Sequence, residues 1–136
     1  MSLELHLRCV GVLLIGLGLS HATFGKRFNW KEEFARVCLL NRQMFYVHCF
    51  FIALTVSMMG ILCLFFTDVL LEKSRLGGAV LGGLTFFWAC RWLIQFFVYD
   101  KSLWRGHAFN TRMHILFSLL WTYLTAVFGW ATWRQF

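Results

Sequence analysis

The chain of 136 residues contains no proline, and only six of its residues are acidic. Proline ends or kinks helices, so its absence allows every apolar run to form an unbroken helix. Transporters with unwound helices usually show glycine or proline interruptions in paired spans. The sequence therefore disfavours that class of protein.

Several catalytic patterns are also missing. The five cysteines include no C-x-x-C pair, which disfavours a thiol–disulfide enzyme. We find no paired carboxylates, no Ser-His-Asp arrangement, no phosphate-binding glycine motif, and neither H-x-x-x-H nor Glu-x-x-His spacing. We therefore do not expect an independent enzyme.

Hydrophobic residues make up 60% of the chain and charged residues 14%. Four apolar runs are long enough to cross a hydrocarbon layer of about 30 Å as helices. The sequence predicts an all-α integral membrane protein, an antiparallel bundle of four transmembrane helices in a single domain, residues 1–136. The predicted spans are about 4–25, 43–67, 76–99 and 113–133.

The first run has an alternative interpretation. Its short apolar region ends in Ser20-x-Ala22, a pattern typical of a cleaved secretory signal. Cleavage would place the most basic loop outside the cell, against the usual distribution of charge. We therefore expect a retained span.

The 13 basic residues predict the orientation. Eight of them lie in the loops 26–42 and 100–112, whereas four lie at the opposite ends of the spans. Basic loops face the cytoplasm, so we expect a bacterial-type inner-membrane protein with both termini outside. Orientation accounts for the basic excess, and membrane lipids rather than nucleic acid are the expected partners.

The first loop also predicts a short interfacial helix. Asn29 and Glu32 have the spacing of a capping box, and four apolar residues fall on one helical face: Trp30, Phe34, Val37 and Cys38. The alternative is that the second span begins early.

Glycines predict where helices pack closely, because small residues allow backbones to approach in lipid. Gly11, Gly18 and Gly25 recur every seven residues in the first span, and Gly78-x-x-x-Gly82 begins the third. These faces also suit packing against other membrane subunits or a second copy of the chain.

Polar side chains gather toward the cytoplasmic ends of the spans. Ionisable groups within a membrane usually face the protein interior, so we expect them to share one pocket. Its members are His21, His48, Trp88, Arg91, Gln95, Tyr99 and His114. The only acidic residue in the predicted spans is Glu4, the first residue of the first span at the opposite end from this pocket, so the sequence gives Arg91 no obvious carboxylate partner within the membrane.

This pocket predicts a redox cofactor, either haem b or a quinone. His48 and His114 are the candidate axial ligands of a haem, with His21 as an alternative to His114, and Arg91 can pair with a propionate. A quinone would instead use four side chains for its carbonyl oxygens, Arg91, Gln95, His48 and Tyr99, with Trp88 and Trp92 beside its ring. We expect a subunit or accessory protein of a larger membrane complex. A structural subunit without cofactor and a lipid-binding or lipid-modifying protein are the alternatives.

Overall fold

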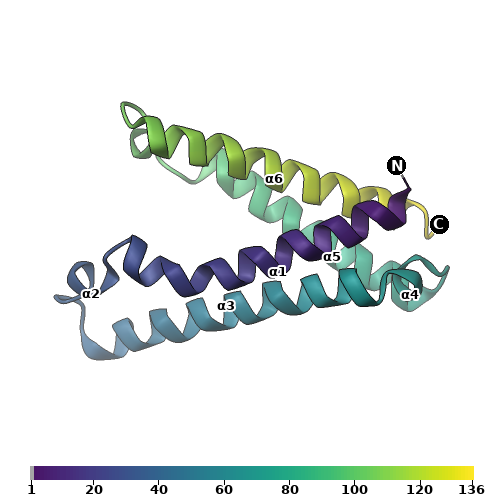
Figure 1. Cartoon of the computed structure of the whole chain (residues 1–136), viewed down its shortest axis with the longest axis horizontal. Helices are drawn as coiled ribbons and strands as arrows, with labels where there is room; N and C mark the ends of the chain where they lie inside the picture. Colours follow the sequence, from purple (N-terminus) through teal and green to yellow (C-terminus); the bar gives the residue numbers. More distant parts are fainter. Residues whose placement is uncertain (1) are drawn as a thin grey trace. The chain divides into compact units, whose positions relative to one another are not determined.

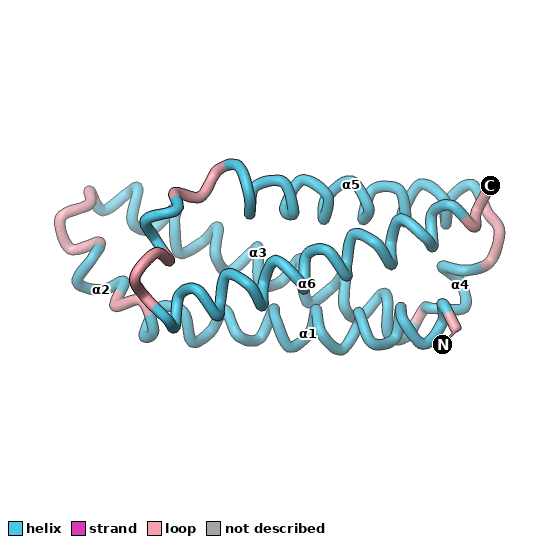
Figure 2. Tube along the Cα trace, turned by 90° about the horizontal axis from the view of Figure 1, so that it is seen from above, coloured by secondary structure: helices cyan, strands magenta, loops and turns pink. Residues whose placement is uncertain are grey.

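A computed structural model describes residues 2–136. Its regular secondary structure is entirely helical, with no strand in that range. Long helices are joined by short loops (Figures 1 and 2). Their bounds are α1 Leu3–Arg27, α2 Trp30–Glu33, α3 Leu39–Phe65, α4 Thr67–Leu71, α5 Arg75–Phe97, the 3-10 helix η1 Lys101–Leu103, and α6 Ala108–Trp133.

Within residues 2–136, the four helices α1, α3, α5 and α6 are long and apolar enough to cross a membrane. Each has at least 23 residues, or about 34 Å at 1.5 Å per residue. This confirms the all-α membrane fold class and the four predicted spans. The helices α3 and α6 begin four and five residues earlier than predicted, because the predicted spans began after the charged residues Arg42 and Arg112, which these helices include.

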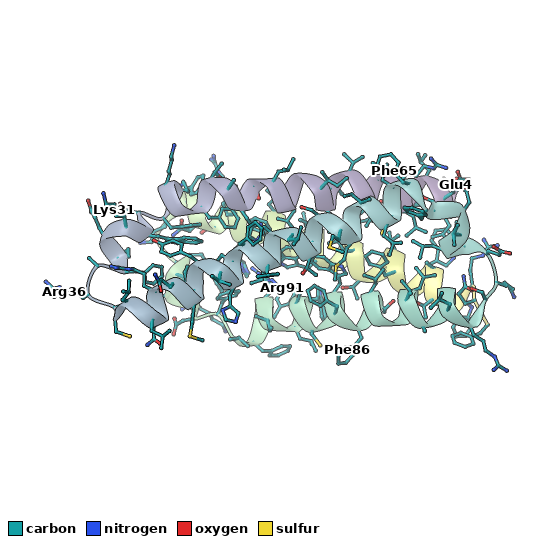
Figure 3. The ribbon with its side chains drawn as sticks, turned by 90° about the horizontal axis from the view of Figure 1, so that it is seen from below. Glu4, Lys31, Arg36, Phe65, Phe86 and Arg91 are labelled. Carbon is teal, nitrogen blue, oxygen red and sulfur yellow. The ribbon has the colours of Figure 1, made fainter. Side chains whose placement is uncertain are left out.

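Large apolar side chains on these helices are widely exposed, among them Phe65, Phe86 and Phe97 at 71–79%. Phe86 points away from its helix (Figure 3). Such exposure is costly in water and favourable in hydrocarbon. The surfaces therefore agree with an integral membrane protein.

The chain divides into two compact units. In the unit of residues 7–67, α1 and α3 lie side by side (Figure 1). A Cβ added at Gly11 would lie 2.8 Å from the carbonyl oxygen of Gly60, and one added at Gly60 would lie 2.8 Å from that of Gly11. One added at Gly18 would meet Ser57 and, at 2.9 Å, the carbonyl oxygen of Ala53. Backbone contact at these glycines fixes the packing of the two helices.

The first loop differs from its prediction. Asn29 has φ 49° and its side chain does not cap α2; its Nδ2 donates to Glu32 Oε2 at 2.5 Å. The predicted capping box is therefore wrong, because a box requires an extended cap residue that accepts from the backbone. The helix has only four residues, so its interfacial position stays a prediction.

Aromatic packing holds this loop against the start of α3 instead. The ring centroid of Trp30 lies 4.8 Å from that of Phe45, and Phe34 lies 4.6 Å from Phe45. Lys31 and Arg36 point outward at the end of this unit (Figure 3).

The second unit comprises residues 68–136 and the beginning of α1. Residues further along α5 contact residues that come earlier in α6. The Thr85 hydroxyl lies 2.9 Å from that of Thr132, and Trp92 Nε1 donates to Thr122 Oγ1 at 2.8 Å. The two helices therefore run in opposite directions. An antiparallel bundle of all four spans in one domain, and the sidedness of the loops, stay predictions.

Capping explains where α5 begins. The Ser74 side chain accepts a hydrogen bond from the backbone N–H of Gly77 at 2.9 Å, which satisfies an otherwise unpaired donor of the first turn. Gln135 joins this end to the chain terminus, because its Oε1 accepts from Ser74 N at 3.2 Å and its Nε2 donates to Leu70 O at 2.9 Å. These bonds anchor the hairpin of α5 and α6 at one end.

Candidate functional site

Helical spacing gathers polar side chains on the facing sides of α5 and α6. Trp88, Arg91 and Gln95 are separated by three and four residues, so they share one face of α5. His114 and Trp121 lie seven residues apart on α6 and also share a face. We call these five residues, Trp88, Arg91, Gln95, His114 and Trp121, the Arg91 cluster.

Gln95 makes three hydrogen bonds, two of which join α5 to α6. Its Oε1 accepts from Arg91 Nη1 at 3.3 Å and from Trp121 Nε1 at 3.2 Å. Its Nε2 lies 2.7 Å from His114 Nδ1. The side chain is only 5% exposed, and a buried amide is tolerated where its donors and acceptors are paired.

The Arg91 guanidinium is bound by an amide oxygen and aromatic faces. Its Cζ lies 4.7 Å from the ring centroid of Trp121 and 5.5 Å from that of Tyr99. Arg91 is half-buried, and cation–π contacts contribute from about 0.5 kcal/mol at exposed sites to about 2 kcal/mol at desolvated ones. In residues 2–136 no carboxylate contacts Arg91, and its remaining N–H donors have no acceptor. The positive charge is thus partly compensated and not neutralised.

Aromatic stacking holds the cluster in place. Trp88 stacks on Trp121 with centroids 5.3 Å apart and planes at 18°, and Phe117 stacks on Trp121 at 5.5 Å and 16°. Trp88 and Trp121 are 2% and 4% exposed. Aromatic pairs contribute about 0.5–1.5 kcal/mol beyond the area they bury, so the cluster lies on a rigid support.

The hydrogen bonds indicate which tautomer His114 adopts. Because Gln95 Oε1 already accepts from two donors, the amide group that faces His114 is the Nε2 donor. His114 Nδ1 therefore accepts, and the single proton of the neutral ring lies on Nε2. His114 acts here as an acceptor through Nδ1.

The loop between α5 and α6 covers His114. Trp104 stacks on the His114 ring with centroids 3.9 Å apart and planes at 12°. Thr111 Oγ1 donates to the Trp104 carbonyl at 2.8 Å, and Gly106 supplies the positive φ of 83° that the turn requires. These contacts hold the indole ring over the imidazole.

Asp100 begins the same loop. Its Oδ1 accepts from the backbone N–H of Ser102 at 2.7 Å. This bond, with a further one from the Ser102 side chain, lowers the pKa of the Asp100 carboxyl because both stabilise the charged form. Asp100 thus caps η1 and makes no contact with Arg91.

The other predicted residues, Tyr99, His21 and His48, are not part of the Arg91 cluster. Tyr99 is 43% exposed beyond the end of α5 and contacts Arg91 only by its ring. His21 and His48 belong to the unit of residues 7–67, and their Nδ1 atoms lie 2.8 Å and 2.7 Å from the carbonyl oxygens of Leu17 and Met44. Both rings therefore donate through Nδ1, which leaves Nε2 with a free lone pair.

Within that unit His48 is turned away from α1. Ala53, five residues later on α3, faces Gly18, and five residues correspond to about 140° of helix rotation. His48 is exposed, whereas His21 is half-buried. The convergence of these two histidines with Arg91 stays a prediction.

The described part of the chain, residues 2–136, contains no group of three or more His, Cys, Asp or Glu side chains placed to hold a metal ion. A histidine that binds iron through Nε2 donates its Nδ1 proton to a neighbour. For His114 this would require the Gln95 amide to turn, with loss of the bonds to Arg91 and Trp121. The arrangement favours a hydrogen-bonding role for His114.

Two residues of the site were not selected from the sequence. Trp121 lies on the same helical stripe as His114, as their seven-residue separation indicates, but it was not chosen as a pocket residue. Trp104 lies in a loop, and no periodicity indicates that it stacks on His114.

No protein-family model matches this chain, and no curated protein or solved structure matches it.

Proposed function

We propose that this membrane protein is a small accessory subunit of a larger membrane complex and that its Arg91 cluster binds a quinone. The observation that carries the proposal is the state of Arg91. It lies six residues before the end of α5, its N–H donors are mostly unpaired, and the contacts described for it include no carboxylate.

The chemistry of the cluster supports a ligand with acceptor oxygens. Arg91 and the Nε2–H of His114 are donors, and Gln95 already uses its oxygen for two bonds. A group that needed to donate a proton would find no acceptor here. Quinone carbonyl oxygens only accept, and ligand sites of this kind combine apolar walls with a few polar groups.

The test is a titration of decylubiquinone into the purified protein in phosphatidylcholine nanodiscs. We expect saturable binding to the wild type. Arg91→Met should weaken binding about 10-fold or more, because hydrogen bonds from charged groups contribute about 1.5–3 kcal/mol. Arg75→Met, at the other end of α5, is the matched control and should bind normally. Absence of binding to the wild type would disprove the proposal.

Haem b is a second candidate, favoured by one specific observation. His21 and His48 each donate through Nδ1 to a carbonyl of their own helix, and this leaves Nε2 available to a metal. A Soret band that disappears in His48→Ala would support haem. A colourless protein with normal quinone binding would exclude it in favour of the quinone.

A structural role without cofactor would also use the network, because Gln95 and Trp121 join α5 to α6. Stability and quinone affinity, measured on the same variant, distinguish the structural role from quinone binding. A structural role predicts that Arg91→Met lowers the melting temperature and the yield of complex, with no quinone bound by the wild type. The quinone proposal predicts a change in affinity that exceeds any change in stability.

A further inference from the structure

Two buried polar atoms in the hairpin of α5 and α6 have no hydrogen-bond partner among residues 2–136. They are Trp88 Nε1 and Thr125 Oγ1. Trp88 is 2% exposed, so its N–H is removed from any solvent. An unpaired donor in an apolar environment is unfavourable, which indicates that an acceptor completes this place in the working protein.

The pairing of α5 with α6 places Trp88 and Thr125 at the same height along the hairpin. Thr85 lies against Gly129 and Thr132, one turn before Trp88, and Trp92 donates to Thr122 one turn after it. Trp88 therefore lies opposite the stretch between these α6 partners, where Thr125 is located. Trp88 also stacks on Trp121, which is one turn from Thr125 on the same face.

Thr125 differs from the other hydroxyls of α6. The side chains of Ser118, Thr122 and Thr132 each donate to the carbonyl four residues earlier, at 2.7–2.8 Å. Such bonds are the usual way to satisfy a hydroxyl within a helix. Thr125 makes none, so its proton remains available for a group outside the helix.

The position of Trp88 and Thr125 along the membrane span indicates which type of acceptor can bind them. Trp88 is 13 residues after the start of α5 and nine before its end, which places it near the middle of the span. An anionic phosphate or carboxylate would be strongly disfavoured there. A neutral carbonyl oxygen has lone pairs for both donors and no charge.

We infer that a carbonyl oxygen of the quinone accepts from Trp88 Nε1 and Thr125 Oγ1; this inference rests on the proposed function. Arg91 lies three residues further along α5, about 4.5 Å in helix rise, and binds the second carbonyl. To reach Trp88 Nε1 and Thr125 Oγ1 the ring must part the stacked Trp88 and Trp121 side chains, because neither donor is open to the surface in the unliganded protein. We expect such a site to select ligands with two opposed carbonyl groups.

The experiment compares decylubiquinone affinity in phosphatidylcholine nanodiscs across variants that keep shape and remove one donor. Trp88→Phe keeps an aromatic ring, and Thr125→Val is isosteric. Each should weaken binding about 2- to 12-fold, the factor for one hydrogen bond of about 0.5–1.5 kcal/mol. Trp92→Phe, whose N–H is already paired with Thr122, is the control and should not change affinity.

Melting temperatures without quinone separate ligand binding from folding. Removing an unpaired donor should leave the unliganded stability of Thr125→Val unchanged or slightly higher. If the wild type and Trp92→Phe bind quinone and both donor variants bind equally well, the inference is wrong and the proposed function stands. If the wild type does not bind and Arg91→Met is indistinguishable from it, the proposed function itself fails.

Discussion

Gln95 Nε2 lies 2.7 Å from His114 Nδ1, and this hydrogen bond connects α5 to α6 at the level of Arg91. The bond orients both partners. The amide oxygen turns toward Arg91 and Trp121, and the imidazole keeps its proton on Nε2. A single glutamine thus determines which groups the cluster offers to a ligand.

We expect His114→Ala to destabilise the protein by about 1–3 kcal/mol, because the buried Gln95 amide loses its acceptor. His48→Ala is the control, since His48 is exposed and bonds only to its own helix; it should change stability by less than about 0.5 kcal/mol. Thermal unfolding in detergent measures both. Equal effects of the two substitutions would contradict the role assigned to Gln95.

Close contact of α1 with α3 predicts a second pair of variants. In Gly11→Ala the new methyl group would lie 2.8 Å from the Gly60 carbonyl oxygen and from Leu64 atoms, so the helices must separate at a cost of about 1–3 kcal/mol. In Gly82→Ala the nearest atom is 3.9 Å away. In an unfolding experiment the Gly82→Ala variant should be at least as stable as the wild type. A loss of stability as large as that of Gly11→Ala would disprove this packing of α1 and α3.

Asp100 predicts a pH dependence. Because its pKa is lower in the folded protein, its contribution to stability is present above the unfolded pKa of about 3.9 and is lost as the pH falls through the folded value. The stability difference between wild type and Asp100→Ala should be constant from about pH 7 to 5 and shrink below about pH 4. Asp100→Asn retains an acceptor oxygen and should lack this pH dependence. If the stability difference between the wild type and Asp100→Ala instead grows as the pH falls, Asp100 does not act as the cap of η1.

Orientation can be tested with Cys38, which is exposed at the start of α3. In a variant that keeps only this cysteine, a membrane-impermeant maleimide should label cells only after permeabilisation, because loop 26–42 is expected in the cytoplasm. A cysteine placed at Gln135 should be labelled in intact cells. The reverse pattern would show that both termini are cytoplasmic.

The spans could be predicted from the sequence because hydropathy and length alone decide which segments can cross a membrane. Helical periodicity also places Arg91 and Gln95 on one face of α5, where His114 of α6 meets Gln95. The partners of Arg91 could not be predicted, because the sequence offers no carboxylate within the membrane and does not show that an amide oxygen and the faces of Trp121 and Tyr99 surround the guanidinium.

Local conformation limited the other predictions. Asn29 and Glu32 have the spacing of a capping box, yet spacing does not determine φ, and Asn29 adopts a left-handed conformation. The glycine pattern of the third span resembles a packing motif, but Gly78 and Gly82 have room for a methyl group. The close crossing instead uses Gly60, whose role depends on the three-dimensional register of α1 and α3.

Binding of a quinone by the Arg91 cluster can be measured directly by organic extraction and mass spectrometry of the protein purified in mild detergent, with an absorption spectrum of the same sample. We expect about one quinone per chain in the wild type, a large loss of quinone in Arg91→Met, and no Soret band. A quinone-free wild-type protein, or a Soret band that depends on His48, would contradict the proposed function.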